Sequence, residues 1–365
     1  MITGEVLLAF CLSKEEYEFK ELKAGHINDT YFVYKKNSDT EKGYIFQRVN
    51  TYVFKEPEKV MHNIDKISGH LKSKLDRDSI FEDYRQMLFF LKTKEGKNFY
   101  VDSSNNFWRA YIYVDRAFTY DNPKSTDILF KMGDKFGIFQ EQLNDFDAKI
   151  LYETIPNFHN TKVRIEKFKK VLAEDKFDRV KEASKEITFL LENADLASKL
   201  SDMVDKNLIN LRVTHNDTKC NNILFDKETL EAVAIIDLDT IMPGLVAYDF
   251  GDAIRSAANI ADEDEKDLSK IAIDLEKFEA FTKGFVPHIK NTHSEVELDS
   301  LALGAFTMAY EVSLRFLTDY FEGNVYFKTK YEKHNLDRAR SQMALAMDMK
   351  NKLNEMNCIV KKYCK

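Results

Sequence analysis

Residues 213–239 read VTHNDTKCNNILFDKETLEAVAIIDLD, and this stretch decides the fold. It contains an HxDxxxxN arrangement, from His215 to Asn222, followed by two short apolar runs that are separated by a polar turn. Two such runs around a turn predict a β-hairpin. The hairpin ends in Asp237 and would return it to the side of the loop. We therefore expect Asp217, Asn222 and Asp237 to converge within one local unit.

These three residues are the kind that phosphoryl transfer requires. One carboxylate must accept the proton of the attacking hydroxyl, and an amide and a second carboxylate must hold Mg²⁺ against the phosphates. We assign the first role to Asp217 and the metal to Asn222 and Asp237, because oxygen ligands suit Mg²⁺ better than zinc. His215 is expected to brace the backbone of the loop instead of transferring protons.

The residues before this stretch favour strands, and those around it favour helices. Runs at 31–34 and 44–49 predict one hairpin, runs at 98–101 and 108–114 predict another, and Pro57 marks the start of a helix between them. Beyond Ser125 the apolar spacing predicts long amphipathic helices, including 262–283 and 301–321. The fold class expected is α+β, two-lobed and protein-kinase-like. Its strand-rich N-lobe would span 1–112 and its helical C-lobe 113–365, with a hinge near 111–119.

The composition of the chain restricts its partners and its compartment. Sixty-one acidic residues against 54 Lys and Arg give a net charge of -7, and no concentrated basic run is present, so nucleic-acid binding is not expected. The four cysteines form no CxxC pair, which fits free thiols in a reducing compartment. The apolar run from Val6 to Leu12 is too short to span a membrane and follows no basic region. A cytoplasmic protein without membrane attachment is therefore expected.

Beyond the catalytic stretch, several motifs together resemble one known superfamily. The sequence resembles the aminoglycoside phosphotransferase/choline kinase superfamily, and within it the N-acetylhexosamine 1-kinases. The stretches that carry the resemblance span nearly the whole chain: THNDTKCNNILF (214–225), IDLDTIMPG (236–244), YDFGDAIR (248–255), GHINDT (25–30), FQRVN (46–50), TIPNFH (154–159), RFLTDY (315–320) and NLDRAR (335–340).

The resemblance implies an ATP-dependent kinase with Mg²⁺ as cofactor, in which Asp217 is the catalytic base and Asp249 braces the catalytic loop. Gly25, with the side chains of Asn28 and Thr30, would lie in the loop that covers the nucleotide phosphates.

The sequence lacks an unambiguous strand lysine for the phosphates. FQRV (46–49) offers Gln47 or Arg48 instead, and we favour Arg48 because a triphosphate needs a cation. The residue that would pair with this strand position, usually a glutamate, is likewise unassigned, with Glu58 and Asn63 both possible.

On the acceptor side, Arg315 is the main candidate, because a guanidinium offers a fork of donors to sugar hydroxyls or to an N-acetyl oxygen. Weaker candidates are His159, Tyr326, Arg338 and Arg340. The resemblance implies that the product is a sugar 1-phosphate.

Other acceptors on the same scaffold stay open, namely choline, ethanolamine, an aminoglycoside or another sugar. A non-catalytic pseudokinase is a further alternative. A hydrolase is disfavoured, since the sequence has neither GxSxG nor HExxH.

Overall fold

The computed structural model describes residues 2–22, 27–38, 42–76, 79, 81–261, 263 and 265–365. The chain divides into two compact units. The N-terminal unit comprises residues 1–119, 145–156 and 222–243, and the C-terminal unit comprises residues 120–144, 157–221 and 244–365. The N-terminal unit thus includes two later segments that the sequence-based boundary had assigned to the C-lobe. One of them, 222–243, carries the hairpin after the catalytic loop.

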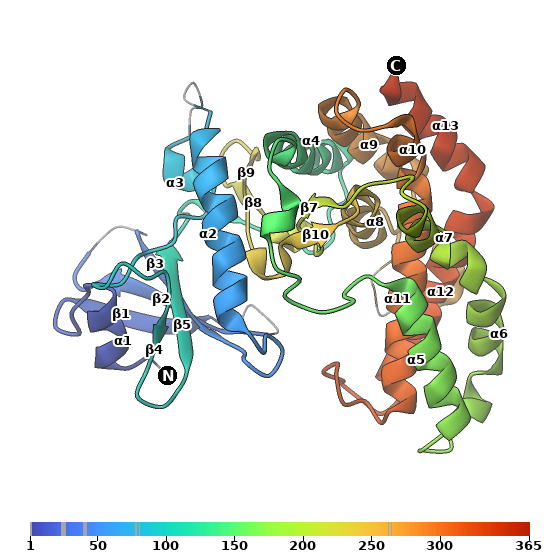
Figure 1. Cartoon of the computed structure of the whole chain (residues 1–365), viewed down its shortest axis with the longest axis horizontal. Coiled ribbons are helices and arrows are strands. Elements are labelled where there is room, and N and C mark those ends of the chain that lie inside the picture. Colours follow the sequence, from blue (N-terminus) through green and yellow to red (C-terminus); the bar gives the residue numbers. More distant parts are fainter. Residues whose placement is uncertain are drawn as a thin grey trace. The chain divides into compact units, whose positions relative to one another are not determined.

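The N-terminal unit is built on an antiparallel sheet with the strand order β1-β2-β3-β5-β4, drawn in blue to teal in Figure 1. A second, smaller sheet has the order β6-β8-β9. The elements of this unit are α1 (Gly4–Ala9), β1 (Tyr17–Leu22), β2 (Asp29–Lys35), β3 (Gly43–Val49), α2 (Pro57–Ser73), α3 (Asp83–Gln86), β4 (Tyr100–Val101), β5 (Phe107–Ile112), β6 (Ala117–Phe118), η1 (Ala148–Ile150), β8 (Ile223–Asp226), β9 (Ala232–Ile235) and η4 (Leu238–Thr240).

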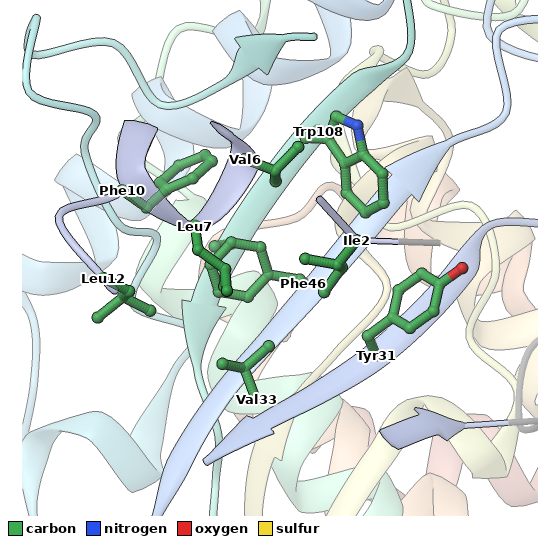
Figure 2. Packing of buried hydrophobic residues seen from close by; sticks show 10 residues of the cluster. Ile2, Val6, Leu7, Phe10, Leu12, Tyr31, Val33, Phe46 and Trp108 are labelled. Carbon is green, nitrogen blue, oxygen red and sulfur yellow. The ribbon is translucent and has the colours of Figure 1, made fainter. Parts of the chain in front are cut away.

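One face of the larger sheet is buried under the N-terminal segment. Figure 2 shows apolar side chains of α1 and its flanks against Val33, Phe46 and Trp108 of the strands. The rings of Phe10 and Phe46 meet edge to face, with their centroids 5.4 Å apart. Because side chains alternate between the faces of a strand, the residues next to Phe46 and Trp108 in sequence project to the opposite face. That opposite face carries the polar row described below.

The three predicted hairpins are confirmed. Strands β2 and β3 pair antiparallel, as do β4 with β5 and β8 with β9. In the β4–β5 turn, the carboxylate of Asp102 accepts hydrogen bonds from the amides of Ser104 (2.9 Å) and Asn106 (2.8 Å) and from Nε1 of Trp108 (2.8 Å). The helix expected from Pro57 is α2, which begins at that residue because a proline at the first helical position has no amide to satisfy.

The C-terminal unit is helical. Figure 1 shows α11 flanked by α5 and α12, and α11 also packs against α8. Its elements are α4 (Thr126–Leu143), α5 (Thr161–Glu174), η2 (Val180–Glu182), α6 (Ser184–Glu192), α7 (Ala194–Asp205), β7 (Arg212–Thr214), α8 (Val246–Ala257), η5 (Leu268–Lys270), α9 (Leu275–Ile289), α10 (Glu295–Asp299), α11 (Leu301–Phe321), α12 (His334–Asn351) and α13 (Leu353–Cys364). Two short elements, η3 (Cys220–Asn222) and β10 (Met242–Gly244), lie where the chain passes between the units.

Helices α8 and α11 cross with their backbones in contact. A Cβ atom added at Gly304 would collide with the carbonyl oxygen of Ala247, and one added at Gly251 would collide with the backbone of Gly304. Glycine at both positions permits this close approach. The crossing fixes the two helices that carry the buried carboxylates Asp249 and Glu311.

The helix predicted over 301–321 is confirmed as α11, whereas the one predicted over 262–283 starts too early. Helix α9 begins at Leu275, because Asp274 caps it by accepting hydrogen bonds from the amides of Glu276 (3.0 Å) and Lys277 (3.1 Å). The apolar spacing before that cap belongs in part to η5.

An antiparallel-sheet N-lobe and a helical C-lobe make up the kinase-like fold that the sequence predicted. Within the described part of the chain, every helix is too short or too polar to cross a bilayer.

Candidate active site

A polar row crosses the face of the N-terminal sheet that lies opposite α1. The strand register pairs Thr30 with Gln47 and Gln47 with Arg109, so their side chains share one face. Nε and Nη2 of Arg109 donate to Oε1 of Gln47 over 2.9 and 2.7 Å, and Nε2 of Gln47 donates to Oγ1 of Thr30 over 3.3 Å. Three neighbouring strands therefore present one hydrogen-bonded row.

The row ends in a buried ion pair with Asp239. Nη1 of Arg109 pairs with Oδ1 of Asp239, and Nδ2 of Asn28 donates to Oδ2 of the same carboxylate over 2.7 Å. The two charged side chains are only 2% and 4% exposed. Burial opposes the charge of Arg109, yet Asp239 outweighs it and raises the pKa of the guanidinium. The amide of Asn50 donates to Oδ1 of Asn28 over 2.9 Å, so the Asn28 side chain is held at both ends.

Arg48, the predicted phosphate ligand, lies outside this row. Its register partner is Trp108, so it projects from the face that α1 covers, where it forms an ion pair with Asp29 at the surface. Of the two residues that the sequence left open, Gln47 is the one in the row. The assignment of Arg48 to the triphosphate stays a prediction. Because Arg48 contacts Asp29 on the other face, Arg109 is the better candidate for the cation of the face that carries the polar row. Gly25 lies outside the described residues.

The predicted metal ligands Asn222 and Asp237 sit at adjoining ends of the β8–β9 hairpin. The amide of Ile236 donates to the carbonyl oxygen of Asn222 over 2.9 Å, and Ile223 is paired with Ile235. Asn222 therefore precedes one strand and Asp237 follows the other at the same end. Asp237 is exposed and has left-handed backbone torsions, φ 60° and ψ 59°.

This pair fits a magnesium ion by the chemistry of its donors. One amide oxygen and one carboxylate are hard ligands, and Mg²⁺ usually takes one or two protein ligands together with substrate phosphates. Among the described residues, no group of three or more His, Cys, Asp or Glu side chains could hold a metal by itself. A site completed by nucleotide phosphates is consistent with both observations.

In the C-terminal unit, Asp217 lies in the loop after β7. Its side chain is 24% exposed and pairs with Nζ of Lys219 over 2.7 Å. The amide of Asp217 donates to Nδ1 of His215 over 3.3 Å, and the buried His215 ring lies beside Phe136 and Phe139. The convergence of Asp217 with the two predicted metal ligands stays a prediction.

Asp249, in the first turn of α8, holds the backbone of this loop. Its carboxylate accepts hydrogen bonds from the amides of His215 (2.8 Å) and Asn216 (2.7 Å) and from Nε2 of Gln140 (3.0 Å). Oγ1 of Thr218 donates to the carbonyl oxygen of Asp249. Burial raises the pKa of Asp249 to about 6. These contacts are those of a positioning residue.

A second buried carboxylate, Glu311 of α11, gathers cations next to the same loop. Oε1 of Glu311 lies 2.9 Å from Nδ1 of His159 and 3.2 Å from Nε of Arg164, and Oε2 accepts from Oγ1 of Thr161 over 3.2 Å. Nε2 of His159 lies 3.1 Å from the carbonyl oxygen of Asn216. Burial opposes the charge of Glu311, but Arg164 and His159 outweigh it and lower its pKa to about 2. His159 thus links the carboxylate to the residue before Asp217.

Arg315 lies one turn after Glu311 on α11 and is surrounded by aromatic rings. Its guanidinium carbon is 5.7 Å from the ring centre of Phe158, 6.0 Å from that of Tyr326 and 5.5 Å from that of Phe327. Arg315 also helps to lower the pKa of Glu311. Of the candidates from the sequence, His159, Tyr326 and Arg315 therefore lie in one region.

The remaining two acceptor candidates have other contacts. Arg340 forms an ion pair of 2.6 Å with Glu186. Arg338 packs over the ring of Phe316 and donates to the carbonyl oxygen of Lys328 over 3.2 Å.

Several residues of the site were missed from the sequence. Lys219 stands two positions after Asp217, inside the HxDxxxxN motif, and this position was the signal that could have marked it as a site residue. The signal for Arg109 was a charged residue within an otherwise apolar strand, and the signal for Asp239 was the DxD spacing at 237–239. Glu311 gave no signal, since its partners are far away in the sequence.

The fold and the loop define the class as a phosphotransferase with a kinase-like fold. Residues 18–268 match the model of the phosphotransferase enzyme family, more than half of the chain, and the chain belongs to this family.

Solved structures of the same fold are similar over nearly the full length. A microcompartment-associated aminopropanol kinase is 14% identical with a TM-score of 0.61, each chain being covered to 97%. A choline kinase from Cryptosporidium parvum is 13% identical with a TM-score of 0.59, covered to 99% on both sides. An aminoglycoside phosphotransferase from Alicyclobacillus acidocaldarius is 10% identical with a TM-score of 0.62, with 99% of this chain and 97% of that one covered.

Proposed function

We propose that this chain is a cytoplasmic, ATP- and Mg²⁺-dependent kinase that phosphorylates the anomeric hydroxyl of an N-acetylhexosamine, giving the sugar 1-phosphate. The observation that carries the kinase assignment is the catalytic loop. The two residues before Asp217 donate their backbone amides to the carboxylate of Asp249. The motif then continues into the β8–β9 hairpin. There Asn222 is hydrogen-bonded to the residue that precedes Asp237.

In the reaction, Asp217 accepts the proton of the acceptor hydroxyl as that oxygen attacks the γ-phosphorus of ATP; the bond from the γ-phosphorus to the β–γ bridging oxygen breaks, and ADP leaves with the electron pair of that bond. Asn222 and Asp237 would hold Mg²⁺, which neutralises phosphate charge when it is bound. Nζ of Lys219 lies 2.7 Å from Oδ1 of Asp217, which puts a positive charge beside the proposed base. An anomeric hydroxyl is more acidic than an ordinary sugar hydroxyl, so a plain carboxylate suffices as the base.

The charge around Glu311 supports a neutral acceptor. Similar structures include kinases named for aminopropanol, choline and ethanolamine, all of which are amino alcohols. A cationic acceptor generally needs surplus carboxylates or an aromatic cage. Here Glu311 is already matched by Arg164, and Arg315 adds a further positive charge. A neutral sugar, with hydroxyl and amide oxygens for Arg315, fits this balance, and the narrower sequence resemblance selects an N-acetylhexosamine.

A coupled ADP-release assay tests the proposal. ATP and Mg²⁺ are supplied with N-acetylglucosamine, N-acetylgalactosamine, glucose, galactose, choline or kanamycin. We expect turnover with the two N-acetylhexosamines and little with choline or kanamycin, with the Asp217→Asn variant as the blank. Turnover restricted to an amine would overturn the sugar assignment but keep the kinase. Absence of ADP release with every acceptor would favour a non-catalytic module.

A further inference from the structure

The N-terminal unit holds a buried ion pair two residues away from the predicted metal ligand Asp237. Both oxygens of Asp239 are engaged, one by Arg109 and the other by Asn28. Asp239 is therefore committed to the protein, whereas the side chain of Asp237 is exposed. We propose that the Arg109–Asp239 pair is a positioning device that holds Asp237 in the geometry needed to bind Mg²⁺-nucleotide. This inference rests on the proposed kinase function.

The backbone of Asp237 explains why such a device is needed. The left-handed region is unfavourable for a non-glycine residue, which persists there only where its surroundings hold it. On the C-terminal side, Asp239 is fixed by Arg109, and the carbonyl oxygen of Ile241 accepts from Nδ2 of Asn63 over 2.9 Å. On the N-terminal side, Ile236 is tied to Asn222. The segment that carries Asp237 is thus held on both flanks.

Arg109 also connects this segment to the sheet. Its two other donors bind Gln47, which in turn binds Thr30, so the ion pair continues the row across β5, β3 and β2. Asn28 attaches the residue before β2 to the same carboxylate. The strand lysine was sought on β3, and the buried cation of this face is instead Arg109 of the neighbouring strand β5. The pair orients groups and is not expected to touch the reacting atoms.

The alternative is that the pair serves stability alone, and the chain offers a matched control for it. Arg85 and Asp226 form another buried Arg–Asp pair in the same unit, 2.7 Å long, with side chains only 2% and 6% exposed. Asp226 ends strand β8, away from Asn222 at the strand's other end. A purely structural role predicts the same behaviour for both pairs.

The experiment compares two double variants in which both members of a pair are neutralised. The first combines Arg109→Gln with Asp239→Asn, and the second, the control, combines Arg85→Gln with Asp226→Asn. Replacing both members avoids leaving the partner charge buried and unpaired, which is the strongly destabilising case. In the control, Asp115, which lies 3.7 Å from Nε of Arg85, keeps Arg116 as a partner at 3.8 Å. Binding of a fluorescent ATP analogue is titrated with Mg²⁺ and again with EDTA, and stability is measured by urea unfolding. The ratio of the two nucleotide affinities reports the metal site without reference to turnover.

We expect the gain in nucleotide affinity on adding Mg²⁺ to fall by at least ~10-fold in the Arg109/Asp239 double variant, the range for residues that orient metal ligands. The affinity in EDTA should change far less, and the Arg85/Asp226 control should retain the Mg²⁺ gain. Equal effects in the two double variants, or an unchanged Mg²⁺ gain in the first, would overturn the inference. A wild-type protein that shows no Mg²⁺-dependent nucleotide binding would overturn the proposed function as well.

A milder variant keeps the test decisive if the double variant does not fold. Arg109→Lys retains the charge beside Asp239 but loses the paired donors to Gln47. We expect a folded protein whose Mg²⁺ gain falls several-fold, against no change in Arg85→Lys. An unaltered Mg²⁺ gain in Arg109→Lys, together with normal stability, would count against the positioning role.

Discussion

Asp239 in the N-terminal unit and Glu311 in the C-terminal unit are both buried carboxylates paired with arginine, but they differ in the charges around them. In the N-terminal unit, Asp239 meets one arginine, and its other contact is the neutral amide of Asn28. In the C-terminal unit, Glu311 meets Arg164 and His159 and lies within electrostatic reach of Arg315. Each carboxylate is thus paired with one arginine, but the next charge differs: Asp237 adds a negative charge within reach of Arg109, and Arg315 adds a positive charge within reach of Glu311.

The difference indicates two kinds of task. A buried pair of opposite charges can fix a backbone segment, because each member compensates the charge of the other. A cluster with surplus donors keeps hydrogen-bonding capacity for a neutral or anionic molecule. The N-terminal cluster therefore suits the positioning of Asp237, and the C-terminal cluster suits the recognition of an acceptor.

The largest expected effect is on kcat, and it comes from Asp217, which belongs to neither cluster. Asp217→Asn should lower kcat by at least ~10²-fold, the scale of a lost general base, with nucleotide affinity largely unchanged. Steady-state kinetics and nucleotide titration measure the two quantities. Asp202→Asn, which alters an ion-paired surface residue of the same unit, should behave like the wild type. Near-normal turnover in Asp217→Asn would exclude this loop as the catalytic one.

Glu311→Gln tests the C-terminal cluster through stability. The folded-state pKa of Glu311 is about 2, below the ordinary 4.5, so its carboxylate stabilises the fold above pH 4.5 and this contribution is lost as the pH falls toward 2. A pKa shift of this size corresponds to a contribution of about 3 kcal/mol to the free energy of unfolding at neutral pH. In urea unfolding, the variant should have a lower free energy of unfolding than the wild type. This difference should be constant from pH 7 to 5 and shrink below pH 4.5.

The control for this prediction is Glu322→Gln, because Glu322 forms a surface ion pair with Lys167 of 2.8 Å. Surface pairs contribute roughly 0–1 kcal/mol, so its effect should be small at every pH. A stability difference for Glu311→Gln that stayed the same down to pH 3 would mean that the carboxylate charge is not what the cluster uses.

Arg315→Ala addresses the acceptor side directly. Loss of a charge-assisted hydrogen bond should weaken kcat/KM for the acceptor by about 1.5–3 kcal/mol, with the KM for ATP nearly unchanged. Arg340→Ala, whose guanidinium is paired with Glu186, serves as the comparison. Equal rises in the KM values for ATP and acceptor would show that Arg315 acts through folding.

The smallest expected effect concerns Arg48. Because its partner is Asp29 at the surface, Arg48→Ala should lower the free energy of unfolding by at most about 1 kcal/mol and leave the KM for ATP nearly unchanged. A rise well beyond tenfold would return Arg48 to the triphosphate and remove the reason for favouring Arg109.

Local patterns made much of the fold predictable. The hairpins around 31–49 and 223–235 and the helix from Pro57 follow from alternation, turn residues and proline chemistry, which are properties of neighbouring residues. The start of α9 was misplaced because the apolar spacing continues before Asp274, whose capping role the pattern did not reveal. Local signals were therefore better at finding elements than at finding their ends.

The site was predictable only where its residues share one motif. Asp217, Asn222 and Asp237 stand within one stretch of 25 residues, whereas the choice between Gln47 and Arg48 required the register of β3 against β5. The partners of Glu311 come from α11 and from the chain around α5, which no spacing in the sequence connects. Burial and long-range pairing decide such contacts, and a single sequence does not express them.

The most direct test of the account is phosphorus NMR of the product formed from ATP, Mg²⁺ and N-acetylglucosamine. We predict a new sugar phosphate resonance coupled to the anomeric proton, with loss of the phosphate in mild acid and loss of reducing-end colour in step with ADP release. A sugar phosphate that stays reducing and acid-stable, with its phosphorus coupled to other ring or methylene protons, would contradict the 1-kinase assignment.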